Sequence, residues 1–109
     1  MSIIGKKIKV VIDRPLGSVH PNYPTMRYPV NYGYTTEFMA GDDDFQDVYV
    51  LGIKEPLNEF EGEVVGVVHR LNDNEDKWVV ATSDFIVSKE EIFKNVQFQE
   101  KYFDVEIEI

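Results

Sequence analysis

The residues best equipped for chemistry are the aspartates of GDDDFQDVYVLG, residues 41–52, where four aspartates fall within six positions. Asp42, Asp44 and Asp47 form a D-x-D-x-x-D pattern, and in an extended segment the first two carboxylates point to the same side. Such a cluster is either a solvated turn or a cage for one or two Mg²⁺ ions. A calcium-binding EF-hand is excluded, because that loop requires glycine and glutamate where this sequence has Asp47 and Ile53.

A second acidic cluster, NDNEDK at residues 72–77, contains Asp73, Glu75 and Asp76. Taken alone, either cluster is readily explained as an ordinary polar turn. Both are predicted to lie at strand ends, however, and two such turns can meet at one mouth of a small barrel. Clusters at opposite ends of the barrel would instead favour a small β-barrel interaction protein.

The composition limits the partners of this chain. Its 109 residues, 43% of them hydrophobic, suit one domain over residues 1–109. The net charge of −9 argues against nucleic acid or an anionic membrane as the main partner. No apolar run reaches the length of a membrane span and no signal peptide is recognised, so a cytoplasmic protein is expected. Without cysteine, any metal should be a hard ion held by oxygen.

The elements that must position the carboxylates are mostly short strands. Lys6–Ile12 is apolar enough for a first strand, and residues 28–34 carry an aromatic or apolar side chain at every second position. Residues 13–29 include four prolines and a glycine, which predicts a long irregular connection. Three further valine-rich strands are predicted, at residues 47–53, 62–69 and 77–82.

One helix is predicted near the C-terminus. Ser88, followed three residues later by Glu91, has the form of a capping box, and apolar residues then recur on one helical face as far as about Tyr102. Residues 105–109 alternate strictly, as a short last strand or a tail would. These patterns predict a mainly β fold: a small closed or partly open OB-like β-barrel of about five strands, with one C-terminal α-helix packed on it.

The motifs, in their order along the chain, resemble those of a known family. YPVNYGY, residues 28–34, followed by DDDFQDVYVLG is similar in spacing to the Y-P-x-N-Y-G-Y and D-x-D-P-x-D-V hallmarks of soluble inorganic pyrophosphatases, which are Mg²⁺-dependent enzymes built on an OB barrel. VVIDRPLGS resembles the first strand of that family, and NDNEDKWVVA its acidic turn. FQEKYFD is a more distant likeness of its aromatic C-terminal helix.

The resemblance implies hydrolysis of inorganic pyrophosphate to two orthophosphates by a metal-activated water, with Mg²⁺ as cofactor and Mn²⁺ as a substitute. Its partners would be pyrophosphate or a related small phosphoanhydride and, as in the bacterial and eukaryotic forms, further copies of itself in a homo-oligomer. Matched position by position, the metal ligands would be Asp13, Asp42, Asp47, Asp73 and Asp76.

The same matching assigns the remaining roles. Asp44 would help to deprotonate the attacking water, and Tyr32 would contact a phosphate oxygen. Tyr102, Lys77 and Arg14 complete the expected substrate contacts.

The sequence also departs from the family pattern. The hairpin before YPVNYGY is shortened to VHPNYPTMR and lacks three charged residues of the family. Phe103 replaces a lysine, and the lysine of the acidic turn aligns with Trp78 unless a shifted register puts Lys77 there. The carboxylates are retained while most cations are missing. A catalytically weakened or inactive metal- and phosphate-binding module is therefore the alternative function.

Overall fold

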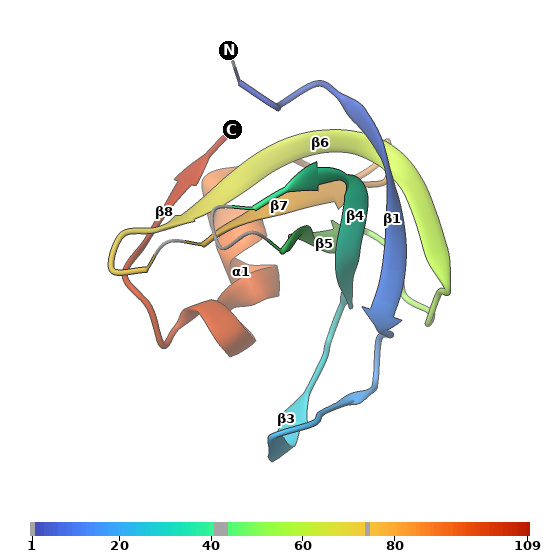
Figure 1. The fold of residues 1–109 in the computed structure, drawn as a ribbon, viewed down its shortest axis with the longest axis vertical. Helices are drawn as coiled ribbons and strands as arrows, with labels where there is room; N and C mark the ends of the chain where they lie inside the picture. Colours follow the sequence, from blue (N-terminus) through green and yellow to red (C-terminus); the bar gives the residue numbers. More distant parts are fainter. Residues whose placement is uncertain (1, 41–43, 74) are drawn as a thin grey trace.

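A computed structural model of the chain describes residues 2–40, 44–73 and 75–109. Five strands pair in a ring, and pairing of the first with the last closes it into a barrel. In ring order the strands are β1 (Lys7–Arg14), β4 (Asn31–Met39), β5 (Phe45–Leu51), β7 (Asp76–Ala81) and β6 (Glu59–Arg70). A short strand, β8 (Val105–Glu108), extends the sheet beside β6, and the helix α1 (Lys89–Glu100) packs behind it (Figure 1). The predicted mainly β barrel with one C-terminal helix is confirmed.

The barrel wall separates two apolar cores. Val48 and Val80 point into the barrel, whereas their neighbours Tyr49 and Val79 point outward to the helix, because successive residues of a strand face opposite sides. These four side chains are completely buried. The parity of a residue in β5 or β7 therefore decides whether its side chain reaches the interior or the helix side.

The helix begins as its sequence predicts. The Oγ of Ser88 accepts a hydrogen bond from the Glu91 N–H at 3.0 Å, so the N-cap is satisfied. The helix ends at Glu100, two residues before the predicted limit. Its buried face consists of Ile92, Val96 and Glu100, spaced four residues apart. The last of these is a fully buried carboxylate beneath the outer face of the barrel.

The segment predicted as an irregular connection contains a hairpin, so that prediction was wrong in part. Strands β2 (Val19–His20) and β3 (Tyr23–Arg27) pair with each other and project below the barrel in Figure 1. The prolines obscured it because Pro21 lies in the turn and Pro24 in a strand of this isolated two-stranded sheet, where no inner ladder is broken.

A glycine sets the closest approach of two barrel strands. A Cβ at Gly33 would lie 1.8 Å from the backbone oxygen of Val11 in the neighbouring strand β1, so only glycine fits there. This explains the glycine of YPVNYGY in structural terms. Within the described residues, no helix is both long and apolar enough to span a membrane.

Candidate functional site

The two acidic segments meet at one end of the barrel, on the face turned toward the helix. Strands β5 and β7 are parallel neighbours, with Val48 opposite Trp78. Lys77 extends from β7 and places its Nζ 2.5 Å from Asp47 Oδ2 and 3.1 Å from Glu75 Oε2. The lysine is only 3% exposed, so it is a buried cation between two carboxylates. This convergence counts against the interaction-protein hypothesis, which clusters at opposite ends would have favoured.

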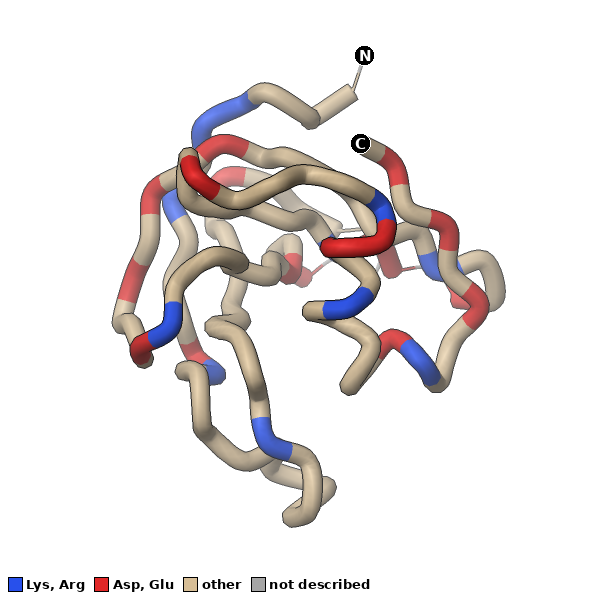
Figure 2. The backbone as a smooth tube through the Cα atoms, turned by 180° about the vertical axis from the view of Figure 1, so that it is seen from behind, with Lys and Arg blue, Asp and Glu red and all other residues tan. Residues whose placement is uncertain are grey.

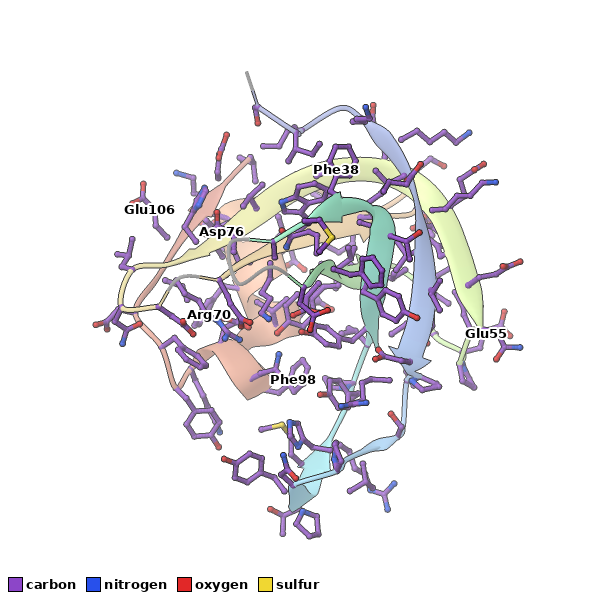
Figure 3. All side chains as sticks on the ribbon, viewed as in Figure 1. Phe38, Glu55, Arg70, Asp76, Phe98 and Glu106 are labelled. Atoms are coloured by element: carbon purple, nitrogen blue, oxygen red, sulfur yellow. The ribbon has the colours of Figure 1, made fainter. Side chains whose placement is uncertain are left out.

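A second buried cation lies beside the first. The Nε and Nη2 of Arg70 each donate to Glu100 at 2.8 Å, a bidentate pair between the end of β6 and the end of α1. Tyr49 also donates to Glu100, at 2.6 Å. The Arg70 guanidinium stacks over the Phe103 ring, 3.7 Å from its centroid. Side chains of sheet and helix meet in this region, where Arg70 and Phe98 are labelled in Figure 3.

The protonation states of this pair are fixed by their contact. Burial alone would raise the pKa of Glu100, but hydrogen bonds from Arg70 and Tyr49 outweigh it and lower that pKa. Burial likewise opposes the charge of Arg70, and Glu100 more than compensates, so the pKa of Arg70 is raised. Both groups are charged at neutral pH. The remaining Arg70 nitrogen, Nη1, lies 3.4 Å from Glu75 and 3.5 Å from Asp73.

Tyr32 lies on the same face of the barrel, next to Asp47 of β5 and Lys77 of β7. Lys77 Nζ is 5.9 Å from the centroid of its ring. Burial, and then the negative charge of Asp47, raise the pKa of Tyr32 well above its usual value. The hydroxyl is therefore a protonated hydrogen-bond donor at neutral pH.

Asp13 and Arg14 lie at the end of β1, close enough for Asp13 to interact with Asp47 of the site. The side chains of Asp13 and Arg14 approach each other to 3.9 Å. Burial is the main cause that raises the pKa of Asp13, and the charge of Asp47 adds to it. Asp13 and Asp47 thus repel each other, which a cation between them would relieve. The Nε of Arg14 is buried and has no hydrogen-bond partner within the described part of the chain.

Asp76, predicted as a metal ligand, is not brought to this group. It adjoins Lys77 in β7 and faces the opposite side of the sheet, where its Oδ1 lies 3.1 Å from His69 Nδ1. Glu75, two positions before Lys77, takes the site-facing position instead. The structure thus adopts the shifted register, with Lys77 toward the site and Trp78 packed against Phe38.

The other predicted residues are placed as follows. Asp42 lies outside the described residues. Asp44 immediately precedes β5 and is exposed at the same end of the barrel as Asp47. Asp73 lies near Arg70, and Tyr102 lines a cavity that also reaches Tyr32 and Lys77.

Sequence reasoning did not assign Glu75 or Glu100 to the site, and it did not predict that Arg70 pairs with Glu100. Glu75 had a usable signal, because it shares strand parity with Lys77. Glu100 also had one, since it lies four residues after Val96 on the predicted apolar face of the helix. Nothing local in the sequence pairs it with Arg70, thirty residues away.

The donor set can be tested for a divalent metal. No group of three or more Asp, Glu or His side chains converges closely enough to hold one among the residues described here. Mg²⁺, however, is usually bound by one or two carboxylates together with waters and substrate phosphates. Asp47 and Glu75 converge on one Lys77 nitrogen, and their ligand atoms are the hard oxygens that Mg²⁺ prefers. These residues fit the ion in that manner.

The fold and the site together define an OB-like barrel that gathers carboxylates and buried cations at one mouth, an arrangement suited to a metal-bound phosphate compound. A family model described as inorganic pyrophosphatase matches residues 3–103. The chain belongs to the inorganic pyrophosphatase family.

Solved structures of bacterial enzymes share the fold. The inorganic pyrophosphatase from Ehrlichia chaffeensis is 23% identical over 96% of this chain and 86% of that chain, with a TM-score of 0.69. For the Helicobacter pylori enzyme the identity is 20% over 98% of this chain and 86% of the other, with a TM-score of 0.70. The Neisseria gonorrhoeae enzyme is 23% identical over 90% and 74%, with a TM-score of 0.66.

Family membership gives the enzyme class of the chain, inorganic diphosphatase. It also implies a divalent metal cofactor and pyrophosphate as substrate.

Proposed function

We propose that this chain catalyses Mg²⁺-dependent hydrolysis of inorganic pyrophosphate to two orthophosphates, as one domain in the cytoplasm. The observation that carries the proposal is the convergence of Asp47, Glu75 and Lys77 at the mouth of the barrel. Phosphoryl transfer depends chiefly on positioning and on neutralising charge, and this cluster supplies both carboxylates and a cation.

The carboxylates would hold the metal. Asp47 and Glu75 are the central ligands, and Asp13, Asp42 and Asp73 are the additional candidates. When bound, divalent cations neutralise the phosphate oxygens and lower the pKa of the attacking water.

The remaining groups act on water and substrate. Asp44, which immediately precedes β5 and is exposed at the same end of the barrel as Asp47, accepts the proton of the water that adds to phosphorus. Tyr32, a phenol that is protonated at neutral pH and whose pKa is raised further by burial, donates a hydrogen bond to a phosphate oxygen. Lys77 stabilises the charge that develops on the departing phosphate. Arg14 and Tyr102 are candidates for outer phosphate contacts.

One observation supports the alternative, a metal- and phosphate-binding module with weak turnover. Lys77 is already paired with Asp47 and Glu75, and Arg70 with Glu100. Neither cation is therefore available to bind an incoming anion. Catalysis requires metal binding to draw Asp47 and Glu75 away from Lys77.

The two functions are separated by a pair of variants and two measurements. Lys77→Met should lower phosphate release from pyrophosphate by about 10²–10³-fold, the loss expected for one preorganised cation. Lys54→Met, at an exposed loop lysine, is the matched control and should leave the rate unchanged. Calorimetric Mn²⁺ binding without phosphate release by the unmodified protein would support the binding module and contradict the enzyme.

A further inference from the structure

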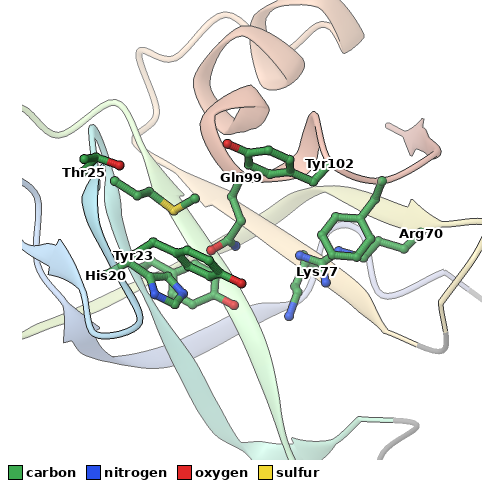
Figure 4. A pocket seen from close by; sticks show the side chains of 10 residues that line it. His20, Tyr23, Thr25, Arg70, Lys77, Gln99 and Tyr102 are labelled. Carbon is green, nitrogen blue, oxygen red and sulfur yellow. The ribbon is translucent and has the colours of Figure 1, made fainter.

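The cavity in front of Lys77 is larger than pyrophosphate requires. It has a volume of about 530 Å³, within the usual range for organic ligands of about 300–1,000 Å³. Figure 4 shows Lys77 and Arg70 on one side of it, with His20 and Tyr23 of the hairpin on the other. A bare diphosphate at the lysine end would leave the hairpin end for another chemical group.

The two ends of the cavity differ in chemistry. The inner end has the buried cations Lys77 and Arg70. Binding of Mg²⁺ by Asp47 and Glu75 would leave Lys77 without its carboxylate partners and so able to pair with a diphosphate. The outer end is lined by rings and an apolar side chain, with Tyr23 59% exposed and Tyr102 66% exposed. Met26 extends this lining, whereas Phe103 stacks on Arg70 at the inner end. Two large rings so exposed beside a cavity provide flat apolar surfaces for a planar ligand.

The hairpin side of the cavity has no charge to offer a second phosphate. Residues 15–26 include no Asp, Glu, Lys or Arg in a chain that is 28% charged, and in Figure 2 the hairpin is drawn almost entirely in tan. The first charged residue after this stretch is Arg27. Arg27 is directed elsewhere, since its Nη1 donates to the Gly17 carbonyl at 3.1 Å and it does not line the cavity. The hairpin side of the cavity therefore favours an uncharged planar group.

The rings of the hairpin are held in place before any ligand binds. His20 Nδ1 accepts a hydrogen bond from the Asn22 N–H at 3.0 Å, which fixes the imidazole. Its ring lies 4.9 Å from that of Tyr23 and stacks at 6.2 Å and 8° on Tyr28. Tyr28 is buried and donates to Gln99 at 3.3 Å. A continuous series of rings thus anchors Tyr23 to the core, so little freedom is lost when a base stacks on it.

We propose that this cavity binds a nucleoside diphosphate, with the diphosphate at Lys77 and the base against Tyr23 and Tyr102. The inference rests on the proposed hydrolase function and extends its substrate class from pyrophosphate to its nucleoside ester. Water adds to the terminal phosphorus and its proton passes to Asp44. The bond from that phosphorus to the bridging oxygen breaks, and the oxygen leaves on the nucleoside monophosphate. The products are nucleoside monophosphate and orthophosphate.

Calorimetry in the presence of Mg²⁺ measures the affinity of the protein for ADP and for methyl diphosphate. Methyl diphosphate carries the same diphosphate but no nucleoside. ADP should bind about tenfold more tightly or better, since stacking of one base on aromatic side chains contributes about 5- to 150-fold. Tyr23→Ala should remove this difference, whereas Tyr23→Phe should keep it. Asn22→Ala, in the same turn but outside the cavity lining, is the control for disturbance of the hairpin.

Equal affinity for ADP and methyl diphosphate in the unmodified protein would overturn the nucleotide proposal, as would an ADP preference that survives Tyr23→Ala. Phosphate release from pyrophosphate, measured on the same samples, reports separately on the hydrolase function. Loss of that activity together with a Tyr23-dependent ADP preference would refute the hydrolysis and retain the nucleotide site.

Discussion

Replacing Arg70 by methionine isolates the contribution of the buried ion pair behind the site. The variant keeps an unbranched apolar stem that can pack over Phe103 but leaves Glu100, which is 0% exposed, without its cation. A carboxylate so buried is expected to take up a proton instead of remaining charged. Starting from the ordinary value of 4.5, neutralisation at pH 7 costs about 3.4 kcal/mol at 1.36 kcal/mol per pH unit. Removing one partner of a buried salt bridge in other proteins costs a similar amount, about 3–5 kcal/mol.

The loss of unfolding free energy in Arg70→Met should depend on pH, because it arises from protonation of Glu100. In the native protein the pKa of Glu100 is lowered, so its stabilisation is present above 4.5 and is lost as the pH falls through the folded value. In the variant the neutral carboxyl costs only about 0.7 kcal/mol at pH 5, because that pH lies half a unit above 4.5. The difference in unfolding free energy between the two proteins should therefore shrink from about 3.4 kcal/mol at pH 7 to below about 1 kcal/mol at pH 5.

Urea unfolding with linear extrapolation at both pH values measures this difference. Lys7→Met is the matched control, because Lys7 forms an exposed pair with Glu61 at 3.7 Å, and it should change the free energy by no more than about 0.5 kcal/mol. A loss for Arg70→Met below about 1 kcal/mol at pH 7, or a loss independent of pH, would refute the reasoning.

Three further variants test the placement of single residues. Gly33→Ala should destabilise the protein by more than about 3 kcal/mol in urea unfolding, since its Cβ would meet the Val11 backbone. Gly62→Ala is the control and should cost less, because its Cβ would meet only the movable Phe60 ring; equal losses in the two variants would contradict this explanation. Ser88→Ala should lower the unfolding free energy by about 0.5–2 kcal/mol through loss of the N-cap, and no change would show the cap to be dispensable. Glu75→Gln should reduce pyrophosphate hydrolysis at least about tenfold more than Asp76→Asn, and the reverse order would show that Asp76 is the ligand.

Alternating apolar residues predicted the strand at residues 28–34, and apolar or valine-rich composition predicted the other barrel strands, because β5 and β7 bury side chains on both faces and so do not alternate. The same signal failed between residues 13 and 29. There the hairpin β2–β3 buries little and contains prolines, so it carries neither the pattern nor the composition of a strand.

The carboxylates were predictable as a group but not one by one. A slip of one residue in a strand exchanges its two faces, and the motif alone does not choose between Glu75 and Asp76. The structure resolves this through Lys77, whose side chain points to Asp47. The pairing of Arg70 with Glu100 depends on where the end of the helix meets the end of β6, a tertiary contact that no local pattern encodes.

The most direct test of the account is orthophosphate release from pyrophosphate by the unmodified protein, with Mg²⁺ and after its removal by a chelator. The account predicts release with Mg²⁺, loss of release with chelator, and a decrease of at least about 10²-fold in Asp47→Asn, which removes a carboxylate at the centre of the cluster. Release that is unchanged in Asp47→Asn, or that persists with chelator, would contradict the proposal that this cluster is the hydrolytic site.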